Sequence, residues 1–370
     1  MPAKISRLRE LDFLRGLAII LVLFRHQYIF DFTYYFMGWI GVDLFFVLSG
    51  FFVSGLLFKE YLKFGNVKPV NFLIRRGFKI YPVYYIFYLV YLIPILAKGN
   101  LNYGLMFADL TFVQNYVSGW GYSFDGSWSL AVEEHFYFAL AIFSWVAIKN
   151  KWLKLEIENT KKGLGKIEII IILVMIVCLG LRVVTNLFYP EQVERNFAMT
   201  HLRIDSLLTG VFISYFFYFR IEYLKIIFEK YKISFLVIVI LGLAWTPFIN
   251  PVNSFFAKTI GFTLLYVSFA IVLMFFLVSE NINKKLNVIF TSPIVNGVSK
   301  IGTYSYSIYI IHGFINYAFA EVQNRYGFYN NYYLNFIITT LLSVVVGMLM
   351  TKLVESYFLN LRDKYFPNRI

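Results

Sequence analysis

The chain has 370 residues, of which 59% are hydrophobic, 21% are aromatic and only 15% are charged, and its mean hydropathy is +0.66. An ordinary globular domain has about 25% charged residues, so this composition excludes a soluble globular protein and indicates a polytopic helical membrane protein. The formal net charge of +13 could suggest a nucleic-acid-binding protein. The basic residues instead follow a membrane topology, as described below, and no nucleic-acid partner is expected.

Long apolar segments predict the architecture. Continuous runs of about twenty residues, rather than the short alternating segments of a β-barrel, indicate an all-α bundle of about ten transmembrane helices. The expected spans lie at residues 13–31, 38–58, 80–97, 128–148, 167–189, 203–219, 233–249, 256–278, 301–320 and 332–351. No small-x-small cleavage site follows the first run, so we expect it to remain as a helix. No long polar stretch separates the runs, so a single transmembrane domain over residues 1–370 and no separate soluble domain are expected.

The basic residues indicate how the chain crosses the membrane. If the N-terminus is cytoplasmic, most of the 34 Lys and Arg residues fall in cytoplasmic segments, and the expected external loops hold only Lys98, Arg195, Lys258 and Arg325. This is the positive-inside rule, and an even number of spans places both termini in the cytoplasm. We therefore expect a multi-pass protein of the inner (cytoplasmic) membrane. The single cysteine and the lack of a His-x-x-x-His pair within one helix predict neither a disulfide framework nor a metal site.

The first span carries two ionisable residues that share a helix face. His26 follows Arg15 by eleven residues, which is almost three helical turns, so both side chains should point to the same side. Their separation along the helix axis is about 16 Å, or half of a bilayer core. Because an ionisable group at that depth is costly in lipid, this face should line a protein interior or an aqueous cavity. Two plainer alternatives stay open: Arg15 as a snorkelling, topology-setting residue and His26 as a hydrogen-bonded packing residue.

Further polar motifs follow along the chain. They are Gly41–Phe51 (GVDLFFVLSGF), Phe72–Pro82 (FLIRRGFKIYP), Trp128–Tyr137 (WSLAVEEHFY), Arg203–Asp205 with Gly210, Ser305–Tyr309 (SYSIY) with His312, and Val354-Glu355. Together with the Arg15 and His26 pair, this ordered set resembles the membrane-bound acyltransferase-3 family over nearly the whole chain. Lys79 stands where that family usually has Arg, and His135 stands where Gln is commoner. The resemblance implies an integral membrane O-acyltransferase with an acyl-CoA donor.

The expected topology places the ionisable residues in two layers. A basic layer at the inner edge of the membrane contains Arg15, Arg75, Arg76 and Lys79. A polar layer in the outer half contains His26, Asp43, Glu133, Asp205 and His312. Guanidinium groups bind phosphates bidentately, so the basic layer suits a phosphate-rich ligand such as coenzyme A that arrives from the cytoplasm. The pantetheine arm of coenzyme A could cross the gap of about 16 Å to the polar layer.

Proton transfer is the chemistry that the polar layer suits. We expect His26 to act as the general base on an acceptor hydroxyl, with Glu133 or Asp43 orienting its ring, because a carboxylate fixes the tautomer of a histidine. A covalent acyl-histidine relay is an open alternative. Glu133 and Glu134 point about 100° apart on one helix, so at most one should face the site, and the motif favours Glu133.

The remaining candidate residues have more than one possible role. Arg203, Asp205, Tyr309 and His312 are expected to bind the acceptor or to support the site. Asp43 and Asp205 could equally have a helix N-terminal role near the membrane interface. The cluster of Arg75, Arg76 and Lys79 could be a plain positive-inside cluster. Ser49-Gly50 is expected to mark close helix packing rather than a nucleophile.

The sequence therefore predicts an O-acyltransferase. It should move an acyl group, first of all acetyl, from cytoplasmic acyl-CoA to a hydroxyl of a cell-surface glycan or lipid-linked saccharide at the outer membrane face. Acetyl-CoA would be a co-substrate, and neither a further cofactor nor a metal is expected. The main alternative is a transporter or flippase that uses the same buried histidine and carboxylate layer to bind a solute or to pass protons.

Overall fold

The computed structural model describes residues 8–26, 38–152, 155, 157, 163–327 and 331–369. These residues form helices, turns and bends, and no strand occurs among them. The α-helices are α1 (Arg9–His26), α2 (Gly41–Phe64), α3 (Pro69–Ala97), α4 (Tyr103–Leu110), α5 (Gln114–Val117), α6 (Ser127–Lys149), α7 (Lys166–Phe188), α8 (Val193–Ala198), α9 (Ile204–Phe219), α10 (Ile221–Ala244), α11 (Phe262–Val278), α12 (Ile282–Phe290), α13 (Ser292–Thr303), α14 (Ser305–Tyr326), α15 (Tyr332–Met350) and α16 (Ser356–Tyr365). Short segments of 3-10 or π type lie at η2 (Thr200–Leu202), η3 (Ala257–Gly261) and η4 (Thr351–Glu355).

Six helical segments in the described part of the chain are long and apolar enough to cross a membrane. They are Gly38–Phe64, Pro69–Ala97, Ser127–Lys149, Lys166–Phe188, Ala257–Val278 and Tyr332–Tyr365. The all-helical, multi-pass architecture predicted from the sequence is therefore confirmed. The number of about ten spans and the cytoplasmic location of both termini stay predictions, and the end of the first predicted span, residues 27–31, lies outside the described residues.

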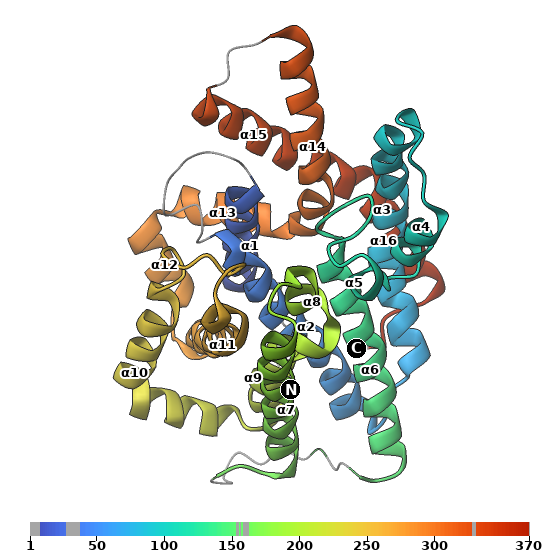
Figure 1. The fold of residues 1–370 in the computed structure, drawn as a ribbon. Coiled ribbons are helices and arrows are strands. Elements are labelled where there is room, and N and C mark those ends of the chain that lie inside the picture. The colour runs from blue at the N-terminus through green and yellow to red at the C-terminus, as the bar shows by residue number, and fades with distance from the viewer. Residues whose placement is uncertain are drawn as a thin grey trace.

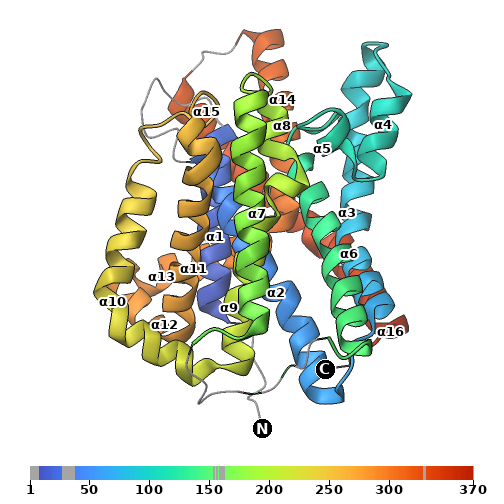
Figure 2. The same ribbon diagram turned by 60° about the horizontal axis from the view of Figure 1, so that its bottom comes forward.

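Helices α3 and α10 differ clearly from the predicted spans, and both begin earlier. Helix α3 begins at Pro69 rather than near residue 80, so the basic motif lies inside the helix and not before it. Proline suits the first helical turn because its missing N–H would have no intrahelical partner there. Helix α10 is bent at Tyr231, whose φ of −113° and ψ of 18° are not helical. Figure 2 shows that the two halves of α10 run in different directions, with the first half across the lower end of the bundle.

The helices approach one another closely at glycines. A Cβ atom added at Gly50 of α2 would collide with the carbonyl oxygen of Leu207 on α9, and one added at Gly210 of α9 would collide with that of Val47. Helix α1 packs in the same way against α13, where a Cβ at Gly302 would collide with the carbonyl oxygen of Asp12. Small residues allow such contacts between membrane helices. The close packing predicted at Gly50 is thus confirmed.

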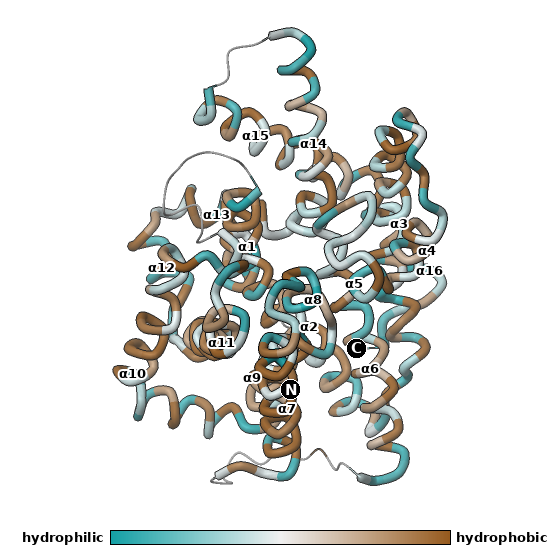
Figure 3. Tube along the Cα trace, in the orientation of Figure 1, coloured by the Kyte–Doolittle hydropathy of each residue, from teal (hydrophilic) through white to brown (hydrophobic). Residues whose placement is uncertain are grey.

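Figures 1 and 2 show how other helices lie around the closely packed α2 and α9. Helices α3 and α6 stand on one side of α2, and α10 and α11 stand on the other side of α9. Hydrophobic residues predominate along α7 and α11, whereas hydrophilic residues gather in the connections between helices (Figure 3). The polar neighbours of the ionisable residues inside the bundle are therefore mainly one another and the cavities that they line.

Candidate active site

The candidate site consists of two cavities. One, with a volume of about 310 Å³, is lined by residues of α1, α2, α3, α6 and α14 that include Arg15, Arg76, Lys79 and Glu133. The other, with a volume of about 930 Å³, is lined by residues that include His26, Asp43, Arg203 and His312. We call them the arginine cavity and the histidine cavity. Both lie in the range of about 300–1,000 Å³ that is typical of ligand sites.

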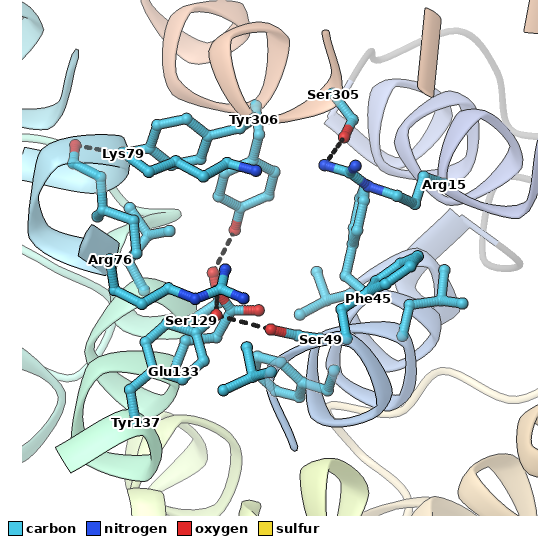
Figure 4. A pocket seen from close by; sticks show the side chains of 18 of the residues that line it. Arg15, Phe45, Ser49, Arg76, Lys79, Ser129, Glu133, Tyr137, Ser305 and Tyr306 are labelled. Carbon is cyan, nitrogen blue, oxygen red and sulfur yellow. Dashed lines mark hydrogen bonds between the residues drawn. The ribbon is translucent and has the colours of Figure 1, made fainter. Parts of the chain in front are cut away.

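Three cationic side chains extend into the arginine cavity (Figure 4). The guanidinium of Arg15 donates to the hydroxyl of Ser305 at 3.3 Å and lies 3.7 Å from the carboxylate of Asp12. Arg76 lies over the ring of Tyr137, with 5.6 Å between the guanidinium carbon and the ring centroid. Neither Arg76 nor Lys79 has a hydrogen-bond or ion-pair partner among the residues that the structure describes. Two such cations beside a cavity have the chemistry to bind an anionic ligand.

Arg75 does not belong to this group. Its guanidinium donates to the carboxylate of Asp363 at 3.0 Å and to the carbonyl oxygen of Phe366, near the C-terminal end of the chain. Arg75 and Arg76 are neighbours on α3 and point in directions about 100° apart, so only one of them can face the cavity. Of the four basic residues predicted to share one ligand, Arg15, Arg76 and Lys79 line the cavity, and their binding of a ligand stays a prediction. Arg75 instead anchors the C-terminal segment.

Glu133 also lines the arginine cavity, at the end of a short hydrogen-bonded chain. The hydroxyl of Tyr137 donates to the Glu133 carboxylate at 2.8 Å, and the hydroxyl of Ser49 lies 2.6 Å from that of Tyr137. Glu134 points elsewhere and accepts a hydrogen bond of 2.8 Å from Tyr81. Glu133 rather than Glu134 thus lines the cavity, and its part in a reaction stays a prediction.

His26 has a different partner from the one predicted. It lines the histidine cavity, whereas Glu133 lines the arginine cavity, and its Nδ1 atom lies 2.9 Å from Nε2 of His312. The contact expected between Glu133 and His26 is absent among the described residues, because Glu133 bonds to Tyr137 and His26 contacts His312. The reason is that α6 presents Glu133 to Tyr137 and the cations, while α14 brings His312 against the end of α1.

The hydrogen bonds of the two rings define their tautomers. Nδ1 of His312 lies 2.6 Å from the carbonyl oxygen of Tyr309, which can only accept, so this nitrogen carries the proton. In a neutral ring the Nε2 atom of His312 is then an acceptor, and Nδ1 of His26 must donate to it. No residue that the structure describes bonds to Nε2 of His26, so this atom carries the lone pair that a general base requires.

Asp43 and Asp205 are engaged in ion pairs within the bundle. The Asp43 carboxylate pairs with Arg203, and that of Asp205 lies 2.7 Å from the guanidinium of Arg182. All four side chains are at most 1% exposed. A buried guanidinium without a carboxylate would be very costly, so these carboxylates serve first to neutralise charge between α2, α7 and α9. Asp43 lines the histidine cavity, but its pairing with Arg203 contradicts the expected role in orienting His26.

A loop that the sequence analysis did not single out forms part of the histidine cavity. Tyr122, Ser123, Phe124 and Asp125 all line it. The carboxylate of Asp109 holds this loop, because it accepts hydrogen bonds from the main-chain N–H groups of Tyr122 and Ser123 at 3.1 Å. A lone carboxylate in the apolar stretch around residues 101–113 was the signal available in the sequence.

Tyr309 lies between the two cavities. Its side chain, together with Val42, lines both of them. The Tyr309 hydroxyl donates to the carbonyl oxygen of Gly126 at 2.9 Å and lies 2.7 Å from the hydroxyl of Ser129. Sequence analysis named Tyr309 only as a supporting residue and did not identify this position.

These features define a multi-pass helical membrane protein with a polar site inside the helix bundle. The chain belongs to the acyltransferase family 3, described as "Acyltransferase domain", whose family model matches residues 8–352. The family suggested by the sequence motifs is thereby confirmed. No solved structure was found to match the chain.

Several curated proteins resemble the chain along much of its length. A "Putative O-acetyltransferase" of Staphylococcus aureus (strain MRSA252) is 28% identical over 409 residues, which cover 99% of this chain and 61% of that protein. "Peptidoglycan O-acetyltransferase OatA" of Listeria monocytogenes is 27% identical over 334 residues, which cover 82% of this chain and 48% of that protein. The chain thus spans about 61% of the length of the first of these relatives.

Proposed function

We propose that the protein transfers an acetyl group from acyl-CoA to a hydroxyl of an envelope saccharide, across the cytoplasmic membrane. The observation that carries this proposal is the meeting of a cationic cavity and a histidine-lined cavity at Tyr309. Membership of the acyltransferase family supports the reaction class. The name of the relative from Listeria monocytogenes supports a glycan acceptor such as peptidoglycan.

The arginine cavity is proposed to hold the donor. Arg76 and Lys79 lack partners in the described part of the chain, so both are available to phosphate oxygens, and Arg15 contributes a third cation. A volume of about 310 Å³ suits the narrow pantetheine arm and the thioester better than the whole of coenzyme A. The nucleotide would then lie at the mouth of the cavity, with its phosphates against the cations.

The histidine cavity is proposed to hold the acceptor. Trp39, Trp120 and Trp128 line it together with several tyrosines and charged groups. Aromatic rings that combine an apolar body with a polar tip suit an amphipathic ligand such as a saccharide. The volume of about 930 Å³ is three times that of the arginine cavity, as expected for a polymer segment rather than a single small group.

The reaction that we propose is a direct transfer. Nε2 of His26 takes the proton of the acceptor hydroxyl while its oxygen attacks the thioester carbonyl carbon. The tetrahedral intermediate collapses and breaks the carbon–sulfur bond, and the thiolate of coenzyme A takes the proton back from His26. His312 holds the His26 ring in the required tautomer through the hydrogen bond at Nδ1 and stabilises the imidazolium that forms.

Purified protein in detergent tests this proposal. The assay contains acetyl-CoA labelled in its acetyl group and envelope glycans of the producing organism from which esters have been removed with mild alkali. The proposal predicts release of free coenzyme A together with alkali-labile label on the glycans, and loss of both with His26→Gln. An intact thioester and unlabelled glycans with folded protein would contradict it and leave the transporter alternative.

A further inference from the structure

Val42 and Tyr309 line both cavities, and we call the place where they do so the junction. The ring of Tyr309 is 7% exposed, and its hydroxyl is fixed by Gly126 and Ser129 of the segment that begins α6. Val42 lies in the first turn of α2, next to Asp43, which is tied to Arg203. Both walls of the junction are thus held in place by buried polar contacts.

Tyr309 also connects the junction to the catalytic histidines. Its carbonyl oxygen accepts the hydrogen bond from Nδ1 of His312, and His312 in turn contacts His26. A single residue of α14 therefore lines the junction with its side chain and orients the histidine pair with its main chain. Movement of Tyr309 to admit a larger group would disturb both arrangements at once.

The position of the junction has a consequence for the transferred group. If the donor lies in the arginine cavity and the base lies in the histidine cavity, the thioester carbonyl must react where the cavities meet. The acyl tail is bonded to that carbonyl carbon and must lie beside it, against the walls of the junction. The space beside Val42 and Tyr309 then limits the length of the acyl group.

We propose that Val42 and Tyr309 restrict the enzyme to short acyl groups and are its determinants of acyl-chain specificity. This inference rests on the proposed function. One additional methylene in an apolar pocket changes selectivity by about 10- to 200-fold when the pocket must either fit or exclude it. The wild-type protein is therefore expected to lose roughly that factor in kcat/KM from acetyl-CoA to propionyl-CoA and again from propionyl-CoA to butyryl-CoA.

The test compares acetyl-CoA, propionyl-CoA and butyryl-CoA with the de-esterified envelope glycans as acceptor. Val42→Ala and Tyr309→Leu enlarge the junction and should each raise the ratio of butyryl to acetyl kcat/KM by at least about tenfold. Val42→Ile narrows it and should lower the ratio of propionyl to acetyl kcat/KM. Val47→Ala is the matched control, because Val47 is a buried valine of the same helix that lines neither cavity. It should leave both ratios unchanged.

The ratios are taken within each protein, so a variant that folds in lower yield still gives a valid answer. Wild-type protein that transfers no acyl group from any of the three donors would overturn the proposed function. Wild-type protein that transfers acetyl, with ratios that are the same in Val42→Ala, Tyr309→Leu and Val42→Ile as in the wild type, would overturn only the role of the junction. Equal changes in Val47→Ala would overturn it as well.

Discussion

Nδ1 of His26 lies 2.9 Å from Nε2 of His312, although the two residues are 286 positions apart in the chain. The contact joins the end of α1 to α14, and the side-chain amide of Asn316 adds a hydrogen bond of 3.2 Å to the His26 carbonyl oxygen. Since Nδ1 of His312 is committed to Tyr309, Nε2 of His26 is the one basic nitrogen of the pair to which no described residue bonds.

Replacement of His26 by glutamine should abolish most of the transfer. A general base contributes about 10²- to 10⁴-fold to a rate, and an amide cannot take the proton of the acceptor hydroxyl. We expect kcat to fall by that range while membrane insertion and thermal stability are kept, as measured by the glycan-labelling assay and by the unfolding temperature. A variant with near-normal kcat would remove His26 from the mechanism.

Replacement of His312 should impair the rate and spare substrate binding. His312→Phe removes the acceptor for the His26 Nδ1–H and should lower kcat by about 10- to 100-fold, because the ring of His26 loses its fixed tautomer. His312→Gln offers an amide oxygen to the same N–H and should recover part of that loss. The measurement is kcat and KM for both substrates. A higher KM with an unchanged kcat would assign His312 to substrate binding instead.

The cations of the arginine cavity should govern donor affinity. Loss of one charge-assisted phosphate contact costs about 1.5–3 kcal/mol, so Arg76→Ala or Lys79→Ala should raise the KM for acetyl-CoA by roughly 10- to 150-fold. Arg75→Ala is the matched control, because Arg75 is adjacent in sequence but contacts Asp363 and Phe366. It should leave the KM for acetyl-CoA within about twofold, a change below 0.5 kcal/mol. Equal effects at Arg75 and Arg76 would contradict the assignment of the donor to this cavity.

The buried pair of Asp43 and Arg203 should matter for stability. Asp43→Asn leaves a guanidinium that is 1% exposed without its carboxylate, and breaking such a pair costs about 3–5 kcal/mol. We expect a large drop in the unfolding temperature in detergent. Glu222→Gln, in the exposed pair of Glu222 and Lys225, is the control and should cost less than about 1 kcal/mol. A variant Asp43→Asn as stable as the control would show that Arg203 finds another partner.

The sequence predicted the features that depend on helical spacing. Arg15 and His26 lie on one continuous helix, α1, as predicted, and each lines a cavity, although the two cavities differ. The motif favoured Glu133 over Glu134, and Glu133 is the one of the two that lines the arginine cavity. Gly50 lies at a close helix contact, as its small size predicted.

The features that depend on how the helices pack against one another could not be predicted from the sequence. Each residue along a helix changes its depth in the membrane by about 1.5 Å, so an error of a few residues in a span boundary shifts the expected depth of every side chain on that helix. At that precision the sequence cannot distinguish one polar layer from two neighbouring cavities. Glu133 and His26 were therefore expected in contact, although they line different cavities. The contact of His26 with His312 and the pairing of Asp43 with Arg203 join segments far apart in the chain and depend on the packing of α14 and α9.

The most direct test of the account is the sidedness of the reaction. Protein is reconstituted in sealed vesicles with the mouth of the arginine cavity outside, de-esterified envelope glycans are trapped inside, and labelled acetyl-CoA is added outside. We predict that label appears as alkali-labile ester on the trapped glycans while free coenzyme A accumulates outside, and that both signals are lost with His26→Gln. Label on glycans only when acetyl-CoA and glycans share one compartment would contradict transfer between two cavities across the membrane.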